Sequence, residues 1–368
     1  GGAGVSPTVA ASRLRERLHR RPFRHSSDWY HARMPLVVVG IDEAGLGPLL
    51  GPLCVGLSAF RVEEWSEGEP RPDLWKLLSR GVCKEPRDAA GRVAVADSKA
   101  LKLANSAKRH PLTHLERGVL AFAAGLTDAE IDSDEALFEL LGVELDDQPW
   151  YRAGAEARIA LPLARSGALQ GIAANLVSGA MSDAGVRLLA MRCRVVAERE
   201  FNAIVDRTGN KADVSLAALA DHLSTALALA HEHPDAAIRV VCDKLGGRDS
   251  YAPVLEKMLP GWTCHIVEQG AERSRYDLMP PRPELLPSGV LRISFQPEAE
   301  DAHLPVALAS MIAKIVRELA MHRFNAFWRG KMPELKPTAG YRLDARRWLG
   351  DAGKVLTRQD RDAMIRRA

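Results

Sequence analysis

Val37-Val38-Val39-Gly40-Ile41-Asp42-Glu43-Ala44-Gly45-Leu46-Gly47-Pro48 is the stretch that decides how this chain folds. Its branched apolar run predicts a strand that is buried on both faces. The glycines and the proline that follow predict a tight turn whose backbone can approach a ligand closely. A second apolar run over residues 53–60 then predicts the antiparallel return strand.

The adjacent carboxylates Asp42 and Glu43 stand inside this apolar segment. A buried carboxylate costs free energy unless a cation, a metal ion or protonation compensates it. In a strand the two side chains point to opposite faces. They can share one metal ion only if the strand ends or kinks there, or if Glu43 reaches over the edge. The alternative interpretation is a solvated acidic pair at a strand end.

Composition indicates a globular protein with a real core, since 46% of the 368 residues are hydrophobic. The net charge of +3 does not identify a nucleic-acid binder, although residues 13–24 and 346–367 are rich in Arg and Lys. The sequence shows no membrane span and no signal peptide by eye. The five cysteines include no CxxC pair, which argues against zinc and for a reducing compartment. We therefore expect a cytoplasmic protein with no membrane contact.

The pattern along the chain predicts three segments. Residues 1–34 are a basic, flexible lead, residues 35–330 form an α/β domain, and residues 331–368 form a basic helical segment. Strands and helices alternate after residue 186, which predicts a sheet covered by helices. Residues 105–182, approximately, are rich in Ala and Leu and predict a helical insertion. Strands are expected at 186–197, 238–243, 262–268 and 290–295, and a long helix at 304–328.

Acidic residues recur at the ends of these predicted elements. Asp243 ends a strand as Asp42 and Glu43 do, and Glu300 and Asp301 precede the long helix. Strand ends and a helix start can gather carboxylates in one cleft. Hard divalent cations such as Mg²⁺ prefer oxygen ligands of this kind. A single acid at a strand end is more often structural, so spacing alone does not establish the site.

Six motifs in this chain resemble those of ribonuclease HII, in the family's order and across about residues 36–350. They are Gly40-Ile41-Asp42-Glu43-Ala44-Gly45-Leu46-Gly47-Pro48, Asp97-Ser98-Lys99-Ala100-Leu101, Asn210 with Ser215 opening a helix, Val240-Val241-Cys242-Asp243, Ala309-Ser310-Met311-Ile312-Ala313-Lys314-Ile315-Val316-Arg317-Glu318, and Gly340-Tyr341.

The resemblance implies a ribonuclease H-like fold with a mixed central sheet flanked by helices and a four-carboxylate centre. Asp42, Glu43 and Asp243 match the family's acids directly. The fourth is Glu300, or Asp301 if one residue is skipped in the alignment. We favour Glu300, whose longer side chain must fold back where the family has Asp. Two Mg²⁺ or Mn²⁺ ions about 4 Å apart would clamp the scissile phosphate and leave a 5′-phosphate and a 3′-hydroxyl.

The resemblance also implies contacts with the substrate. Lys99 and Lys314 could contact phosphate, or could be surface charges. Tyr341 would sense the 2′-hydroxyl at the ribonucleotide junction, or could be a core tyrosine. Arg317 is expected to pair with a carboxylate. The full set of expected substrate-binding residues is Gly45, Leu46, Gly47, Lys99, Asn210, Ser215, Arg248, Lys314 and Tyr341.

Arg248 belongs to that set because of a departure from the family. Leu46 stands where the family usually has the arginine of Gly-Arg-Gly, and leucine cannot replace a guanidinium contact. Arg248, on a glycine-rich loop beside Asp243, could restore that contact. The departure leaves open whether single ribonucleotides, hybrids or DNA are preferred.

We therefore expect a metal-dependent endoribonuclease that cuts the RNA strand of RNA/DNA hybrids or ribonucleotides within duplex DNA. The alternative is a module of the same fold that binds hybrid or other nucleic acid with weak or no nuclease activity. A third hypothesis is a nuclease acting on DNA.

Overall fold

The computed structural model describes residues 33–67, 69–88, 90–104, 107–152, 158–164, 166–245 and 248–367. The predicted basic lead thus lies outside the described residues, except for positions 33 and 34. These two begin the first strand, so the folded domain starts two residues earlier than the boundary expected from the sequence.

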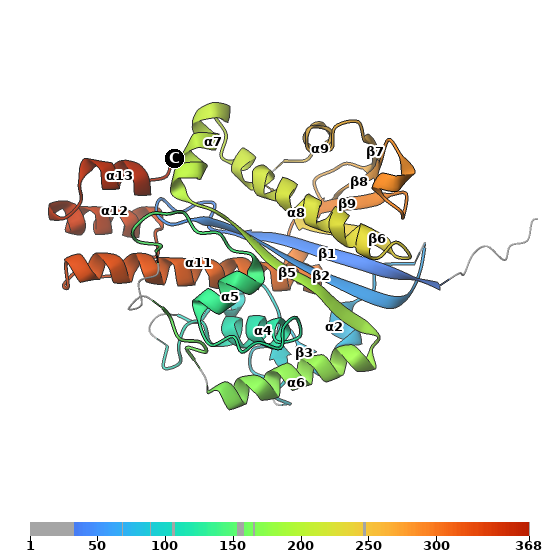
Figure 1. The fold of residues 1–368 in the computed structure, drawn as a ribbon, viewed down its shortest axis with the longest axis horizontal. Coiled ribbons are helices and arrows are strands. Elements are labelled where there is room, and N and C mark those ends of the chain that lie inside the picture. The colour runs from blue at the N-terminus through green and yellow to red at the C-terminus, as the bar shows by residue number, and fades with distance from the viewer. Residues whose placement is uncertain are drawn as a thin grey trace, which may run out of the picture.

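A seven-stranded mixed sheet, in the order β5-β2-β1-β6-β9-β8-β7, runs through the middle of the molecule (Figure 1). Strand β1 is antiparallel to β2 and parallel to β6, and β6 is parallel to β9. The predicted mixed sheet flanked by helices is therefore confirmed. The strands are β1 (Arg33–Ala44), β2 (Leu53–Ser66), β5 (Val186–Val196), β6 (Ala237–Asp243), β7 (Thr263–Glu268), β8 (Ser274–Met279) and β9 (Leu291–Gln296), with a separate small pair β3 (Val82–Cys83) and β4 (Val93–Ala94).

Helices cover both faces of this sheet (Figure 1). They are α2 (Leu74–Leu77), α3 (Ser98–Leu101), α4 (Thr113–Ala123), α5 (Asp134–Leu141), α6 (Gly167–Asp183), α7 (Glu198–Thr208), α8 (Ala212–Glu232), α9 (Ala252–Met258), α10 (Ala299–Ala302), α11 (Leu304–Lys331), α12 (Arg342–Asp351) and α13 (Arg358–Met364), with short 3-10 turns at Pro283–Leu285 and Ala352–Lys354.

The alternation of side chains along β1 divides the core into two layers. Val37, Val39 and Ile41 pack with helices α7 to α9 on one face. Val38 points to the other face, where it packs with Val306 of α11. Helices α4 to α6, which occupy the predicted insertion, pack on that second side against α11. Asp42 and Glu43 continue this alternation at the end of the strand, so each faces a different helical layer.

Two sequence expectations need correction or comment. Strand β8 was not predicted, although Tyr276 and Leu278 are buried and alternate with Arg275 and Asp277. Helix α8 is long and apolar enough to cross a membrane by length and composition. However, 56% of its apolar window is buried, and α8 packs against the central sheet.

Candidate functional site

Four acidic side chains from three separate parts of the chain meet at one end of the central strands. Asp42 and Glu43 lie at the end of β1, Asp243 ends β6, and Glu300 lies on the short helix α10. The charge of Asp243 acts on each of Asp42, Glu43 and Glu300. Asp243 is therefore the centre of the cluster.

Asp42 and Glu43 approach this centre from opposite faces of β1. Asp42 interacts with the hydroxyl of Ser310 on α11, which covers one face. Glu43 interacts with the hydroxyl of Ser215 on α8, which covers the other. Because β1 ends at Ala44, Glu43 lies at the rim of the sheet, where its carboxylate can reach the cleft.

Glu300, rather than Asp301, faces the other acids. Glu300 is only 7% exposed, and its charge interacts with Asp42 and Asp243. Asp301 is exposed, and its recorded contact is through its backbone carbonyl, which accepts a 2.6 Å hydrogen bond from Lys84. Neighbouring residues of a helix point about 100° apart, so only one of the two can face the cleft.

Burial raises the pKa of all four carboxyl groups. For Asp42 the pKa is well above its usual value, because burial is reinforced by the charges of Asp243 and Glu300. Hydrogen bonds only partly oppose this effect; one of them runs from the backbone N–H of Ala299 to Asp243 at 3.3 Å. The cluster thus holds negative charge that a cation would stabilise.

Two glycines allow α11 to lie close enough to the sheet to complete the cluster. A Cβ atom on Gly40 would lie 2.1 Å from the backbone of Pro305, and one on Gly56 would lie 2.1 Å from the carbonyl oxygen of Ala309. Ser58 also donates a 2.7 Å hydrogen bond to the Pro305 carbonyl. This close approach carries α10 and the start of α11 to the ends of β1 and β6.

Lys99 faces the same carboxylates from α3. Partial burial lowers its pKa, but the charges of Asp97, Glu300, Asp42 and Asp243 together raise it above the usual value. The side chain of Asp97 also caps α3 by accepting a 3.0 Å hydrogen bond from the Lys99 backbone. Lys99 is therefore an exposed cation that interacts with the acidic cluster, rather than an isolated surface lysine.

The glycine turn after β1 is held by Arg366, a residue that the sequence analysis did not identify. Its guanidinium is buried and donates hydrogen bonds to the carbonyls of Gly45 at 2.5 Å and Leu46 at 2.7 Å. It also lies 3.7 Å from the ring centroid of Phe201. Its charge lowers the pKa of Glu43, although burial dominates that group. Arg366 therefore supplies a guanidinium at the turn where the side chain of Leu46 cannot.

Arg317 corrects another expectation. The predicted carboxylate partner is absent from the described part of the chain, and the buried guanidinium instead donates to backbone carbonyls. These are Pro52 at 2.7 Å, Leu50 at 3.2 Å and Ala339 at 3.0 Å. A single side chain of α11 thereby ties the glycine turn to the loop before Tyr341.

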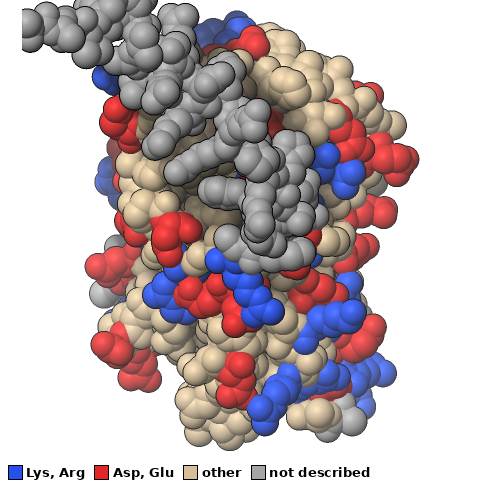
Figure 2. All heavy atoms as spheres, turned by 90° about the vertical axis from the view of Figure 1, so that its right-hand side faces the viewer, with Lys and Arg blue, Asp and Glu red and all other residues tan. Residues whose placement is uncertain are grey.

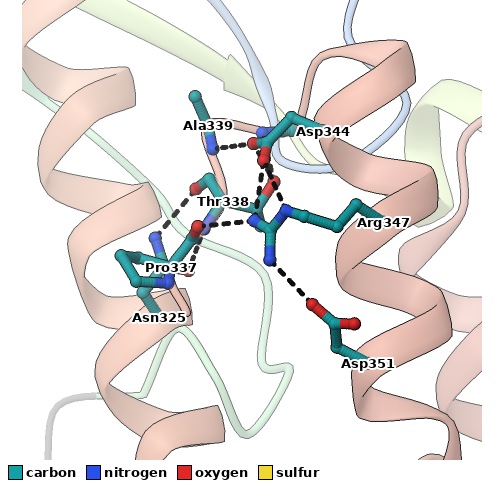
Figure 3. Close-up of polar contacts among 8 residues, drawn as sticks. Asn325, Pro337, Thr338, Ala339, Asp344, Arg347 and Asp351 are labelled. Carbon is teal, nitrogen blue, oxygen red and sulfur yellow. Dashed lines mark hydrogen bonds and ion pairs between the residues drawn. The ribbon is translucent and has the colours of Figure 1, made fainter. Parts of the chain in front are cut away.

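The loop of residues 337–340 is further braced from two helices (Figure 3). Asn325 of α11 exchanges two 2.9 Å hydrogen bonds with the backbone of Thr338. Asp344 of α12 accepts hydrogen bonds from the hydroxyl of Thr338 at 2.6 Å and the backbone of Ala339 at 2.9 Å. Arg347 holds Asp344 in place through a 2.7 Å ion pair. The loop is thus fixed before it reaches Tyr341.

Tyr341 is presented to solvent beside the glycine turn. The carbonyl of Gly340 accepts hydrogen bonds from the backbone of Leu49 at 2.8 Å and Leu50 at 3.1 Å. Gly340 has φ = 83°, and a Cβ there would lie 2.2 Å from the Leu50 carbonyl oxygen. The Tyr341 side chain is 49% exposed, so the core-tyrosine interpretation is wrong.

The remaining predicted residues lie at different distances from this arrangement. Ser215 is buried beside Glu43, whereas Asn210 is exposed and caps the start of α8 through its side chain. Arg248 contacts Asp213 at 3.7 Å. Lys314 is buried and paired at 2.9 Å with Glu318, which also pairs with Lys102. Gly47 has open space around its Cα, so its backbone is accessible.

The donor set of the cluster fits a divalent cation. All four candidate ligands are carboxylates, the type that Mg²⁺ and Mn²⁺ prefer. One oxygen of Glu43 and one of Glu300 are buried without a hydrogen-bond partner among the described residues. Within the same residues, no three acidic, histidine or cysteine side chains already converge to hold a metal ion. Metal binding would therefore draw the carboxylates closer together.

On the end of the molecule shown in Figure 2, basic and acidic side chains are interspersed over the parts that the grey atoms leave visible. This agrees with the small net charge of +3. Recognition of a charged ligand on this visible face would therefore depend on local sites rather than on a broad cationic surface.

No family model matches this chain, and no curated protein does. Among solved structures, it is similar to the PCNA–RNase HII complex from Archaeoglobus fulgidus, with 14% identity, a TM-score of 0.36, and coverage of 90% of this chain and 94% of that one. It is also similar to ribonuclease H2 from Pyrococcus horikoshii OT3, with 13% identity, a TM-score of 0.37, and coverage of 87% and 88%. Because both structural similarities are weak, the functional argument rests on the side chains of the carboxylate cluster.

Proposed function

We propose that this protein is a divalent-metal-dependent endoribonuclease. It hydrolyses the RNA strand of RNA/DNA hybrids, or ribonucleotides within duplex DNA, and leaves a 5′-phosphate and a 3′-hydroxyl. The observation that supports the proposal best is the convergence of Asp42, Glu43, Asp243 and Glu300 from three elements into one charge-coupled cluster, in which Asp42 and Glu300 are buried and the other two partly buried. Such a cluster is costly unless a cation compensates it.

The four carboxylates would hold Mg²⁺ or Mn²⁺, which supplies a Lewis acid and lowers the pKa of an attacking water. Around that centre, Lys99 is placed to bind a phosphate oxygen at the mouth of the cluster. The hydroxyls of Ser310 and Ser215 lie beside Asp42 and Glu43 and lower the pKa of each carboxyl group. The exposed ring of Tyr341 and the glycine turn stand side by side, where they can contact a ribose and its 2′-hydroxyl.

The test is cleavage of a labelled RNA/DNA hybrid in the presence of Mg²⁺ or Mn²⁺. We expect Asp42→Asn and Glu300→Gln to abolish cleavage, because each removes one charge from the cluster. Asp301→Asn is the matched control, since it removes the same charge from the adjacent exposed residue and should cleave as the wild type does. Cleavage that is indifferent to Asp42→Asn, or lost equally in Asp301→Asn, would refute the assignment.

Metal binding gives a second readout that does not require turnover. A ligand that binds only the folded state raises its stability, by about 2.7 kcal/mol at 100 times Kd. Mn²⁺ should therefore raise the unfolding temperature of the wild type and of Asp301→Asn, but not of Asp42→Asn. If Mn²⁺ stabilises all three proteins equally, it binds elsewhere.

The alternative is a hybrid-binding module without turnover. It is favoured by Leu46 and by the spacing of the carboxylates, since no three of them in the described residues are already close enough to hold a metal ion. Hybrid binding that is insensitive to metal, with no cleavage, would identify it. Comparing hybrid, single-ribonucleotide duplex and plain duplex DNA would determine which substrate is preferred.

A further inference from the structure

A cavity separate from the carboxylate cluster has five arginines among its eleven lining residues, together with one acidic residue, Glu69. Its volume is about 460 Å³, and it lies on the sheet face that α11 covers. Strands β6, β8 and β9 contribute to its wall, together with the segment after β2 and the residue before α11. The basic residues that line it are Arg71, Arg239, Arg273, Arg275, Arg292 and His303.

The pairing of the strands places like charges next to one another. Arg239 of β6 pairs in register with Arg292 of β9. Like charges at directly opposed positions of a sheet are destabilising. The pKa of Arg71 is lowered to about 10, because its guanidinium is partly shielded from water and faces other arginines, Arg273 and Arg275 first among them. Bringing these cations together therefore lowers the stability of the folded protein.

Carboxylates compensate only part of this charge. Three of the arginines have acidic partners: Arg239 with Glu67, Arg273 with Glu268 and Arg292 with Asp277. Among the described residues, no carboxylate lies within ion-pair distance of the other two.

The uncompensated pair is Arg71 and Arg275. Within the described residues, Arg71 hydrogen-bonds only to neutral groups, the hydroxyl of Ser294 at 3.3 Å and a ring nitrogen of His303 at 3.2 Å. The Nε of Arg275 is buried and has no hydrogen-bond partner in the part of the chain that the structure describes. A buried donor of this kind costs free energy until an acceptor reaches it.

We propose that this cavity binds a phosphate group. Guanidinium forks match the oxygens of phosphate, and an anion placed here would satisfy Arg71 and Arg275 at once. The phosphate comes either from a free phosphorylated molecule or from the backbone of a nucleic acid bound at the carboxylate cluster. The second source rests on the proposed function.

The position of the cavity suits both sources. Arg239 and Asp243 lie four residues apart on β6 and point to the same face, which separates them by about 13 Å along the strand. This is less than one turn of a duplex, about 34 Å. A duplex with one phosphate at the carboxylates could thus place another near the arginines.

The first experiment uses inorganic pyrophosphate and the metal-free protein, with a chelator present so that pyrophosphate cannot bind through a metal. Phenylglyoxal modifies accessible arginines, and mass spectrometry locates the modified ones. We expect pyrophosphate to protect Arg71 and Arg275 in the wild type, but not Arg80, which is exposed, pairs with Asp183 and does not line the cavity. This measurement needs no substitution, so a variant that fails to fold cannot obscure it.

The second experiment measures binding of a short fluorescein-labelled RNA/DNA hybrid in the same buffer, with Arg275→Gln and the control Arg80→Gln. If the pocket takes a backbone phosphate, Arg275→Gln weakens hybrid binding roughly tenfold or more and lowers the salt slope by about one. If it takes a free phosphate, pyrophosphate protection is seen while hybrid affinity is unchanged.

Absence of protection at Arg71 and Arg275, together with equal hybrid affinity in Arg275→Gln and Arg80→Gln, would overturn the proposal. Neither measurement requires cleavage or metal. Absence of nuclease activity would therefore not refute the phosphate site. Likewise, failure of the cavity to bind phosphate would not refute the proposed nuclease activity.

Discussion

Replacing Arg366 by methionine tests how the glycine turn is supported. The substitution removes donors to the carbonyls of Gly45, Leu46 and Gly51, the last at 3.3 Å. It keeps an apolar side chain against Phe201. The free-energy change follows from two opposing contributions.

Hydrogen bonds from a charged donor contribute about 1.5–3 kcal/mol each, so three of them contribute roughly 4.5–9 kcal/mol. Burial opposes this. It lowers the pKa of Arg366 from 12.5 to about 9, with Arg317 adding to the effect, which corresponds to about 5 kcal/mol. The difference is on the order of 2 kcal/mol in favour of the native residue, or about 2–3 °C in unfolding temperature for a chain of this size.

The effect on activity should exceed the effect on stability. Arg366 lowers the pKa of Glu43, so its removal raises that pKa further and leaves less ionised Glu43 at a given pH. We expect the pH profile of hybrid cleavage to move to higher pH in Arg366→Met. Arg366→Lys keeps the charge but loses the fork, and should restore the profile more than the stability.

Arg367→Met is the matched control, because Arg367 is exposed and pairs with Asp206 at 3.1 Å on the surface. Unfolding is followed by circular dichroism and cleavage by gel assay across pH. If Arg366→Met and Arg367→Met show the same unfolding midpoint and the same pH profile, Arg366 does not support the turn and the reasoning fails.

Three further predictions concern other parts of the fold. Gly40→Ala should push α11 away from the sheet and lower the free energy of unfolding by about 1–3 kcal/mol, as measured by denaturant titration. Gly47→Ala is the control: a Cβ atom there has open space, so the same free energy should change by less than about 0.5 kcal/mol. Tyr341→Ala should change stability equally little, because its side chain is exposed, yet slow hybrid cleavage; a large loss of stability would contradict this. Burial lowers the pKa of His222 from 6.5 to about 4, so on acidification the unfolded chain takes up a proton before the folded protein does. The free energy of unfolding should therefore fall as the pH drops from about 6.5 to about 4, by up to about 3 kcal/mol. His222→Gln should lose this part of the pH dependence, and the control His265→Gln should retain it.

The sequence predicts the central strands well because the signal is local. Branched apolar runs ending on Asp42 and Asp243 mark both the strand and its functional end. Strand β8 carried a recoverable signal as well, since Tyr276 and Leu278 alternate with charged residues. Its charged positions are explained by the arginine cavity, to which Arg275 contributes.

The rest depends on contacts between distant residues, which local patterns do not encode. Which of Glu300 and Asp301 faces the other carboxylates depends on how α10 is rotated about its axis relative to β6. The sequence of these neighbouring residues does not reveal that rotation. Arg366 lies 320 residues from Leu46 in the chain, so no spacing rule could pair them. The basic stretch that contains Arg366 is also typical of a solvated tail, so it does not single out Arg366 as a buried residue.

Arg317 has a consequence for how such a protein can diverge. It grips Leu50, Pro52 and Ala339 by their carbonyl oxygens, a chemical feature that every amino acid shares. Substitutions at those three positions can therefore accumulate without loss of these hydrogen bonds, provided that the local backbone path is kept. Homologous proteins held together in this way would diverge in sequence while the local backbone kept its shape. Their relationship would then be easier to detect from the backbone geometry than from a sequence alignment.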